Sequence, residues 1–283
     1  MQLSNYHSHC TFCDGRSFPE DFVKFAIQHQ FRAYGFSSHS PLPFETSWNM
    51  SKDNMDEYLT EINRLKRKYA DQLEIYVSLE IDFLDKTYNP SIDYFQNLPL
   101  DYRIGSVHYL PLAYPLLEKN MMCMDGSFTD YENALNIHYE GDIRKLVRHY
   151  YQSSAEMVEA GGIDIVGHMD KIYMNGQRCK GFSIDAAWYT KEVLEYMDLI
   201  AEKGLMVEIN TKNLVKKHET YPHKNFFPAL LERKIPVMVN SDCHYPDLVN
   251  DGRKEAFELL KAYGFKSTCE LVNGVWTEMG IEG

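Results

Sequence analysis

Short apolar segments alternate with longer segments of helical periodicity along the whole chain. The apolar segments are rich in β-branched and aromatic residues, which favour strands. They span roughly residues 2–7, 33–38, 73–83, 102–110, 162–168, 204–210 and 235–241. Because segments of helical character separate these strands, the pattern predicts an α/β fold with a parallel sheet.

Three of the intervening segments carry clear helix signals. In the segment 55–69, apolar residues recur on one face, and Asp53 is placed to cap the helix. A second helix is expected to begin at Pro19, because proline is favoured at the first helical position. A third helix is expected over residues 184–203, where Gly204 would end it.

Residues of the types that bind metals follow almost every predicted strand. These strand-end residues are His7, His39, Glu80, His108, His168 and Asp242. An open doubly wound sheet would spread such residues out, whereas a barrel gathers the carboxyl ends of its strands around one mouth. The pattern therefore favours a barrel over an open sheet.

Two of these positions belong to pairs separated by one residue, His7 with His9 and Asp242 with His244. Alternate side chains of an extended chain point the same way, so each pair can present two ligands to one ion. Cys243 should then point away from the metals. One such pair arises easily by chance, but two pairs at strand ends favour a metal site.

With Asp14 included, the candidate metal ligands are His7, His9, Asp14, His39, Glu80, His108, His168, Asp242 and His244. This set exceeds the three or four protein ligands of one zinc-type ion and suits two or three divalent ions. Glu80 is the candidate catalytic carboxylate, because a bridging carboxylate would hold two ions ~3.5–4 Å apart for hydrolysis. Imidazole and carboxylate ligands without paired thiolates favour Zn, Fe or Mn.

The composition narrows the choice of partners and location. The 283 residues include 29 basic and 41 acidic ones, and the net charge of −12 disfavours nucleic acid as a partner. No membrane-length apolar run or signal-peptide pattern is present, so a cytoplasmic protein without membrane contact is expected. The six scattered cysteines are expected to be reduced thiols. No linker-like tract interrupts the chain, which predicts a single domain over 1–283, as a monomer or small homo-oligomer.

The order and spacing of these motifs resemble those of the PHP (polymerase and histidinol phosphatase) superfamily over nearly the whole chain. The motifs are His7-Ser8-His9 with Asp14-Gly15, Ser37-Ser38-His39-Ser40-Pro41, Leu79-Glu80, Ser106-Val107-His108, Gly167-His168-Met169-Asp170, Glu208-Ile209-Asn210-Thr211 and Asn240-Ser241-Asp242-Cys243-His244. Within that superfamily, the chain looks like the stand-alone branch that acts on L-histidinol phosphate. The resemblance implies a distorted (β/α)7 TIM-like barrel with a trinuclear metal centre at the carboxyl-terminal mouth of the strands.

The resemblance also assigns the ligands to three metals. It places the first metal on His7, His9, Glu80 and Asp242. It places the second metal on Glu80, His108 and His168, and the third on Asp14, His39 and His244. Many relatives have histidine at the position of Asp14.

The implied reaction is hydrolysis of L-histidinol phosphate to L-histidinol and phosphate in histidine biosynthesis. Our hypothesis is that a hydroxide bridging the first two metals attacks phosphorus in line, while the third metal binds a phosphate oxygen. Asp242 or His244 would relay a proton to the departing alkoxide, with Asp170 as a further candidate. Arg16 and Lys212 would add positive charge at the phosphate.

Two other functions stay open. A PHP enzyme acting on another small phosphate ester or a nucleotide would carry the same ligands, because the metals handle the phosphoryl group and not the alcohol. A non-catalytic metal-binding protein is disfavoured, because structural metal sites are closed and usually rich in cysteine.

The segment 110–139 is long for a connection between a strand and a helix, which suggests a lid over the mouth. Its methionine cluster, residues 121–124, is expected to pack in the interior rather than to hold substrate. Histidinol carries an ammonium group and an imidazole, so an acidic partner is expected. Glu118, Asp125 and Asp130 all lie in this segment, and the sequence does not choose among them.

Overall fold

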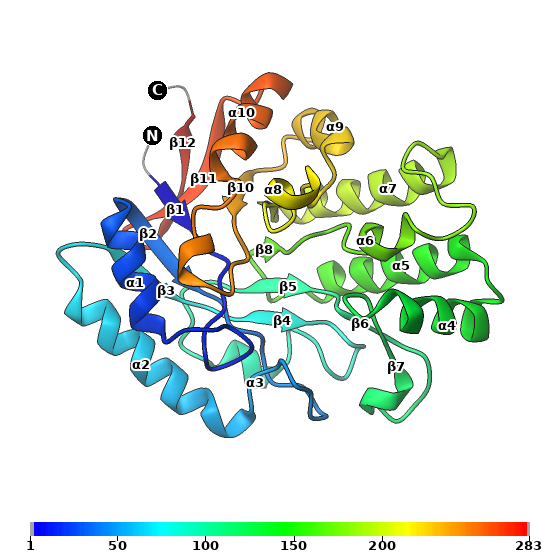
Figure 1. Cartoon of the computed structure of the whole chain (residues 1–283), viewed down its shortest axis with the longest axis horizontal. Coiled ribbons are helices and arrows are strands. Elements are labelled where there is room, and N and C mark those ends of the chain that lie inside the picture. The colour runs from blue at the N-terminus through cyan, green and yellow to red at the C-terminus, as the bar shows by residue number, and fades with distance from the viewer. Residues whose placement is uncertain (1–2, 282–283) are drawn as a thin grey trace.

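The computed structural model describes residues 3–281, over which strands and helices alternate (Figure 1). The strands are β1 (Leu3–Asn5), β2 (Phe31–Phe36), β3 (Glu74–Val77), β4 (Glu80–Asp82), β5 (Ile104–Ser106), β6 (Tyr109–Pro111), β7 (Met121–Cys123), β8 (Ile165–Val166), β9 (Met206–Asn210), β10 (Val237–Asn240), β11 (Ser267–Val272) and β12 (Val275–Gly280). The α-helices are α1 (Pro19–Gln28), α2 (Met55–Lys68), α3 (Asp93–Gln96), α4 (Phe128–Tyr139), α5 (Ile143–Ala160), α6 (Tyr173–Gly176), α7 (Ala187–Lys203), α8 (Leu214–Lys217), α9 (Phe227–Glu232) and α10 (Arg253–Tyr263). Short 3-10 helices span Lys52–Asn54, Glu118–Asn120, Lys224–Phe226 and Pro246–Leu248. Residue 2 of the predicted strand 2–7 lies outside the described residues.

The parallel strands form two sheets, with the strand orders β1-β2-β3 and β10-β9-β8-β5-β4. Every strand pairing within these sheets is parallel, which confirms the predicted α/β class. Two isolated bridges connect the sheets: Ser8 after β1 pairs with Cys243 after β10, and His39 after β2 pairs with Glu80 in β4. The strands of residues 3–281 do not pair into one continuous closed sheet, so closure of the barrel stays a prediction.

The predicted strand 73–83 is divided in the structure, and the expectation that Glu80 ends a strand is wrong. The N–H of Ser78 donates to the carbonyl of Phe36, so the chain still pairs with β2 there. The carbonyl of Leu79 accepts from the N–H of Ile104, which begins β5. Glu80 is the first residue of a new strand, β4, which pairs with β5, while the N–H of Glu80 still donates to carbonyls of the segment that follows β2.

The helices cover the sheets with the apolar faces that the periodicity predicts, but Asp53 does not cap α2. A 3-10 turn precedes this helix, and Asn54 occupies its N-cap position. The side chain of Ser51 accepts from the N–H of Asp53, which therefore lies inside the turn. Pro19 begins α1, and Gly204 ends α7 with a φ of 65°, as predicted. None of the helices in residues 3–281 is long and apolar enough to cross a membrane.

A hydrophobic cluster fills the amino-terminal end of the strands. It includes Ile104, Ile165 and Met206, each of which is the first residue of its strand. The C-terminal hairpin β11–β12 lies against this cluster, and its Trp276 packs edge-on against Tyr6 with a ring-centroid distance of 5.4 Å. Because this end is apolar and covered, the polar side chains of the strands gather at the opposite, carboxyl end.

The segment 110–139 has more regular structure than a loop, because it contains the β6–β7 hairpin and helix α4. Met121, Met122 and Met124 are buried in the hydrophobic cores. The methionines therefore pack in the interior, as predicted.

Candidate metal centre

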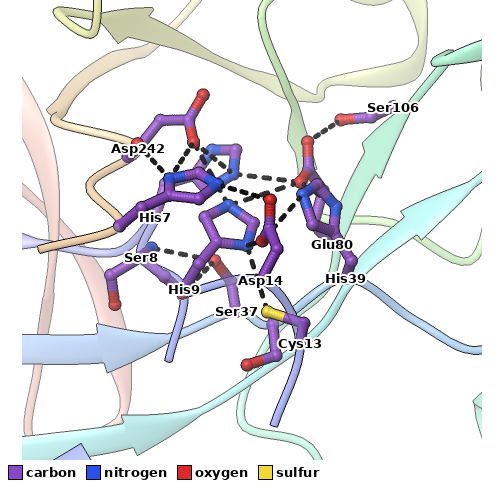
Figure 2. Close-up of polar contacts among 12 residues, drawn as sticks. His7, Ser8, His9, Cys13, Asp14, Ser37, His39, Glu80, Ser106 and Asp242 are labelled. Atoms are coloured by element: carbon purple, nitrogen blue, oxygen red, sulfur yellow. Dashed lines mark hydrogen bonds and ion pairs between the residues drawn. The ribbon is translucent and has the colours of Figure 1, made fainter. Parts of the chain in front are cut away.

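The predicted ligands come together at the carboxyl ends of the strands, and Figure 2 shows six of them, His7, His9, Asp14, His39, Glu80 and Asp242. His7 and His9 follow β1, His39 follows β2, Glu80 begins β4, His108 follows β5, His168 follows β8, Asp242 and His244 follow β10, and Asp14 lies between β1 and α1. Asp14 and His244 are half-buried, whereas the others are buried. A set drawn from so many separate segments indicates that the fold is built to assemble this site.

The two alternating pairs lie as their spacing predicts. The rings of His7 and His9 are on the same side, with centroids 5.1 Å apart. Ser8 points the other way and donates from Oγ to a main-chain carbonyl of β2. Cys243 also points away from the cluster, with its Sγ 3.6 Å from the hydroxyl of Tyr34. None of the cysteines in residues 3–281 forms a disulfide, so the thiols are free as predicted.

Glu80 is the carboxylate that contacts most of the histidines in the cluster, and Figure 2 shows it beside His39. Its Oε2 is 3.2 Å from Nε2 of His7, 3.6 Å from Nε2 of His9 and 2.9 Å from Nδ1 of His39. Burial alone would raise the pKa of Glu80, but the surrounding imidazoles hold it well below its usual range. This carboxylate is therefore ionised where it meets the histidines.

The other oxygen of Glu80 faces a separate pair of histidines. Oε1 is 2.9 Å from Nε2 of His168 and 3.4 Å from Nε2 of His108, and it accepts a hydrogen bond from Oγ of Ser106. The two oxygens of the Glu80 carboxylate thus face two different groups of imidazoles. This arrangement suits a carboxylate that bridges two cations.

Asp242 and Asp14 complete two further groups. Oδ1 of Asp242 is 3.2 Å from Nε2 of His9, and Oδ2 of Asp14 is 3.2 Å from Nε2 of His244. Asp242 has a φ of 47°, in the left-handed region that non-glycine residues rarely adopt. Such strain in the backbone is typical of residues whose side chains must be aimed at a functional site.

The potential ligand atoms gather into groups within 4.8 Å of one another. The groups are His7 with His9 and Asp242, His39 with Glu80 and His108, and His9 with Asp14, His39 and His244. They broadly match the three-metal assignment, with three differences. Glu80 is not part of the group of His7, His9 and Asp242. His9 and His39 each belong to two groups, and His168 lies beside Glu80 and His108 without being part of their group.

The cluster contains buried polar atoms that no protein hydrogen bond satisfies. They include Nε2 of His7, Nε2 of His9, Nδ1 of His39, Oδ1 of Asp14 and Oε2 of Glu80. A buried polar atom without a partner is costly, and native proteins rarely contain several in one place. Because these atoms converge, they fit divalent cations as their missing partners.

Other carboxylates hold the ring orientation of these histidines. Nδ1 of His7 donates to Oε2 of Glu208 at 2.8 Å, and Nδ1 of His108 donates to Oδ1 of Asp82 at 3.0 Å. In both histidines the other ring nitrogen, Nε2, faces Glu80. Oε1 of Glu208 also accepts from the N–H of His168. This is how proteins usually orient metal-binding imidazoles.

Glu208 belongs to one of the sequence motifs, but no role was predicted for it. Asp82 was not predicted as a site residue. Asp82 lies two residues beyond Glu80 on the same strand, so the alternation of side chains could have placed both near the site. The contact of Glu208 with His7 joins segments that are far apart in the chain, and only the fold reveals it.

A cavity of about 310 Å³ opens onto the cluster. Its walls are formed by Asp14, His39, Trp48, His108, Cys123, Asp125, Gly126, Lys212, Asp242 and His244. Nζ of Lys212 lies 3.0 Å from Oδ1 of Asp242, so this predicted phosphate-binding residue is in the site. Trp48 and Cys123 were not predicted.

Arg16 and Asp170 lie outside the walls of this cavity. Arg16 is exposed, although its N–H donates to the carbonyl of His244. Strand β8 ends at Val166, so the extended geometry that would align Asp170 with His168 is missing and that expectation is wrong. Asp170 is buried and accepts from the N–H of His223, and burial raises its pKa to about 7.

A parallel α/β fold with a buried cluster of imidazoles and carboxylates at its strand ends is typical of metal-dependent hydrolases. The family model of the PHP domain matches residues 5–212, which is more than half of the chain. The chain therefore belongs to the PHP family, as the motifs predicted.

Relatives match almost the full length of the chain. It is 27% identical over 271 residues to the "Probable histidinol-phosphatase" of Deinococcus radiodurans, covering 93% of this chain and 94% of that protein. It is 24% identical to the histidinol-phosphatase of Bacillus subtilis, covering 86% and 94% of the two chains. A solved structure of histidinol phosphate phosphatase from Lactococcus lactis, complexed with Zn, L-histidinol and phosphate, has a TM-score of 0.73 and 21% identity. That comparison covers 98% of this chain and 99% of the other, so the fold is shared throughout.

Proposed function

We propose that this protein is a metal-dependent phosphatase that hydrolyses L-histidinol phosphate to L-histidinol and phosphate in histidine biosynthesis. The position of Glu80, with one oxygen toward His7, His9 and His39 and the other toward His108 and His168, carries the proposal. Histidinol-phosphatases that match the chain over most of their length support the choice of substrate.

We assign two or three divalent ions, Zn, Fe or Mn, to the ligand groups around Glu80. A first ion would be held by His7, His9, Glu80 and Asp242, a second by Glu80, His108 and His168, and a third by Asp14, His39 and His244. When bound, such ions neutralise phosphate charge and lower the pKa of bound water toward 7. A mixed set of imidazoles and carboxylates that opens into a cavity supports a catalytic rather than a structural site.

The protein's own side chains would bind the phosphate and move the proton. The ammonium of Lys212 faces the cavity beside Asp242 and would bind a phosphate oxygen. The alkoxide that leaves phosphorus needs a proton, which we assign to Asp242 or His244 because both line the cavity. Arg16 is exposed at the loop beside Asp14, where it would attract the substrate dianion over a longer range.

We also propose that the two sheets act as one distorted barrel within a single domain. The two bridges between the sheets and the filled amino-terminal end support this arrangement. The substrate is then a small phosphate ester that reaches the metals through the carboxyl-terminal mouth.

Expression of this protein in a bacterium that lacks histidinol-phosphatase is expected to restore growth without histidine. The Glu80→Gln variant, produced at the same level, should not restore growth, because it removes the bridging charge. Growth rate in medium without histidine is the measurement. If the folded wild-type protein accumulates but gives no growth, the assignment to histidine biosynthesis is wrong.

A further inference from the structure

The cavity contains two features that the metal ligands do not use, an indole and a carboxylate. Trp48 comes from the connection between β2 and α2, and Asp125 from the connection between β7 and α4. Both line the cavity beside the ligand His108. Neither side chain belongs to the groups of potential metal ligands.

Trp48 is held rigidly at the edge of the metal site. Its Nε1 donates to the hydroxyl of Tyr109 at 3.0 Å, and the two rings stack with centroids 5.5 Å apart. The indole also meets the ring of His39 edge-on at 4.4 Å and that of His108 at 5.3 Å. A fixed aromatic surface next to the ligands suits a flat or cationic group of the substrate.

Asp125 is the acidic residue of segment 110–139 that reaches the cavity. One of its oxygens, Oδ2, lies 3.0 Å from Nζ of Lys171, which is 3% exposed. Its Oδ1 accepts no hydrogen bond from residues 3–281, and the side chain is 36% exposed. By contrast, Asp130 accepts from Oγ of Ser127 at the start of α4, and Glu118 does not line the cavity.

The main chain around Asp125 is also fixed. Nδ2 of Asn175 donates to the carbonyls of Met124 and Gly126, the residues on either side, at 3.1 Å each. Partial burial would raise the pKa of Asp125, but the ammonium of Lys171 and nearby imidazoles lower it to about 2. Asp125 is therefore a pre-positioned, ionised carboxylate that lines the cavity.

We propose that Asp125 and Trp48 form the subsite that recognises the alcohol portion of the substrate, with Oδ1 of Asp125 accepting from its ammonium group and Trp48 packing against its imidazole. The inference rests on the proposed function, because it takes L-histidinol phosphate as the substrate. Only three covalent bonds separate the ester oxygen from the ammonium nitrogen, so a phosphate at the metal ligands places that nitrogen within the same small cavity. The two features together would select a cationic, aromatic alcohol over other phosphate esters.

The test measures kcat/KM for three esters with metal-loaded protein: L-histidinol phosphate, its analogue without the amino group, and an amino-alcohol phosphate without the imidazole. In Asp125→Asn, the preference for L-histidinol phosphate over the desamino analogue is expected to fall roughly ten- to a hundred-fold, as for a lost charge-assisted hydrogen bond. In Trp48→Leu, the preference over the ester without imidazole is expected to fall about tenfold. Trp48→Phe should recover part of that preference.

Glu118→Gln is the matched control, because it removes an acidic residue of the same segment that does not line the cavity. Both preferences should be unchanged in this variant. If Asp125→Asn lowers kcat/KM equally for the esters with and without the amino group, the subsite is wrong while the proposed function stands. If the wild-type protein does not hydrolyse L-histidinol phosphate, the proposed function fails and the subsite fails with it.

Discussion

The Glu80→Gln variant is expected to lose activity on L-histidinol phosphate by about a thousand-fold, since a catalytic metal contributes several kcal/mol and each 1.4 kcal/mol is tenfold in rate. Glutamine keeps the shape of the side chain but replaces one oxygen with a nitrogen that cannot bind a metal. The histidines on both sides of Glu80 then lose their shared anion. Bound metal per chain, measured by elemental analysis, should fall together with the rate.

Glu45→Gln is a suitable control, because Glu45 is an exposed carboxylate on the connection between β2 and α2. This variant should keep both its metal and its activity. If Glu80→Gln retained its full metal content and rate, Glu80 could not be the bridging ligand.

Removal of metal with a chelator is expected to abolish phosphate release while leaving most of the fold in place. The hydrophobic clusters hold the sheets and helices together independently of the ligands. The histidines and carboxylates would be left close to one another, and the protein should lose some stability without unfolding. Circular dichroism and the phosphate release rate, measured before chelation, after it and after addition of Zn or Mn, provide the test.

A structural metal site would behave differently under the same treatment. Its removal would unfold the chain, because the free energy of metal binding would then be part of the free energy of folding. Loss of the circular dichroism signal on chelation would favour the non-catalytic metal-binding protein that the sequence left open. Recovery of the rate with unchanged circular dichroism would favour the enzyme.

The convergence of the candidate ligands was predictable because it depends on local geometry. In His7-Ser8-His9 and Asp242-Cys243-His244, the alternation of an extended chain alone decides which side chains point together. The gathering of strand ends at one mouth then follows from parallel pairing. Both rules act over a few residues or within one sheet, and hydrophobic patterning is enough to apply them.

Other features depend on contacts between distant segments, which periodicity does not encode. The division of the strand before Glu80 depends on two distant partners, because β3 pairs with β2 and β4 pairs with β5. The support of His7 by Glu208 and the pairing of Lys171 with Asp125 likewise join separate parts of the chain. The expected cap at Asp53 failed for a local reason, because the hydroxyl of Ser51 begins a 3-10 turn ahead of the helix.

The most direct test of the account is the rate of phosphate release from L-histidinol phosphate by protein loaded with Zn or Mn, measured beside a panel of other phosphate monoesters and nucleotides. The account predicts efficient, metal-dependent turnover of L-histidinol phosphate and much weaker turnover of the other esters. Feeble and unselective release across the whole panel would contradict the assigned substrate. Efficient turnover of a nucleotide or sugar phosphate instead would mean that the metal centre serves the hydrolysis of that ester.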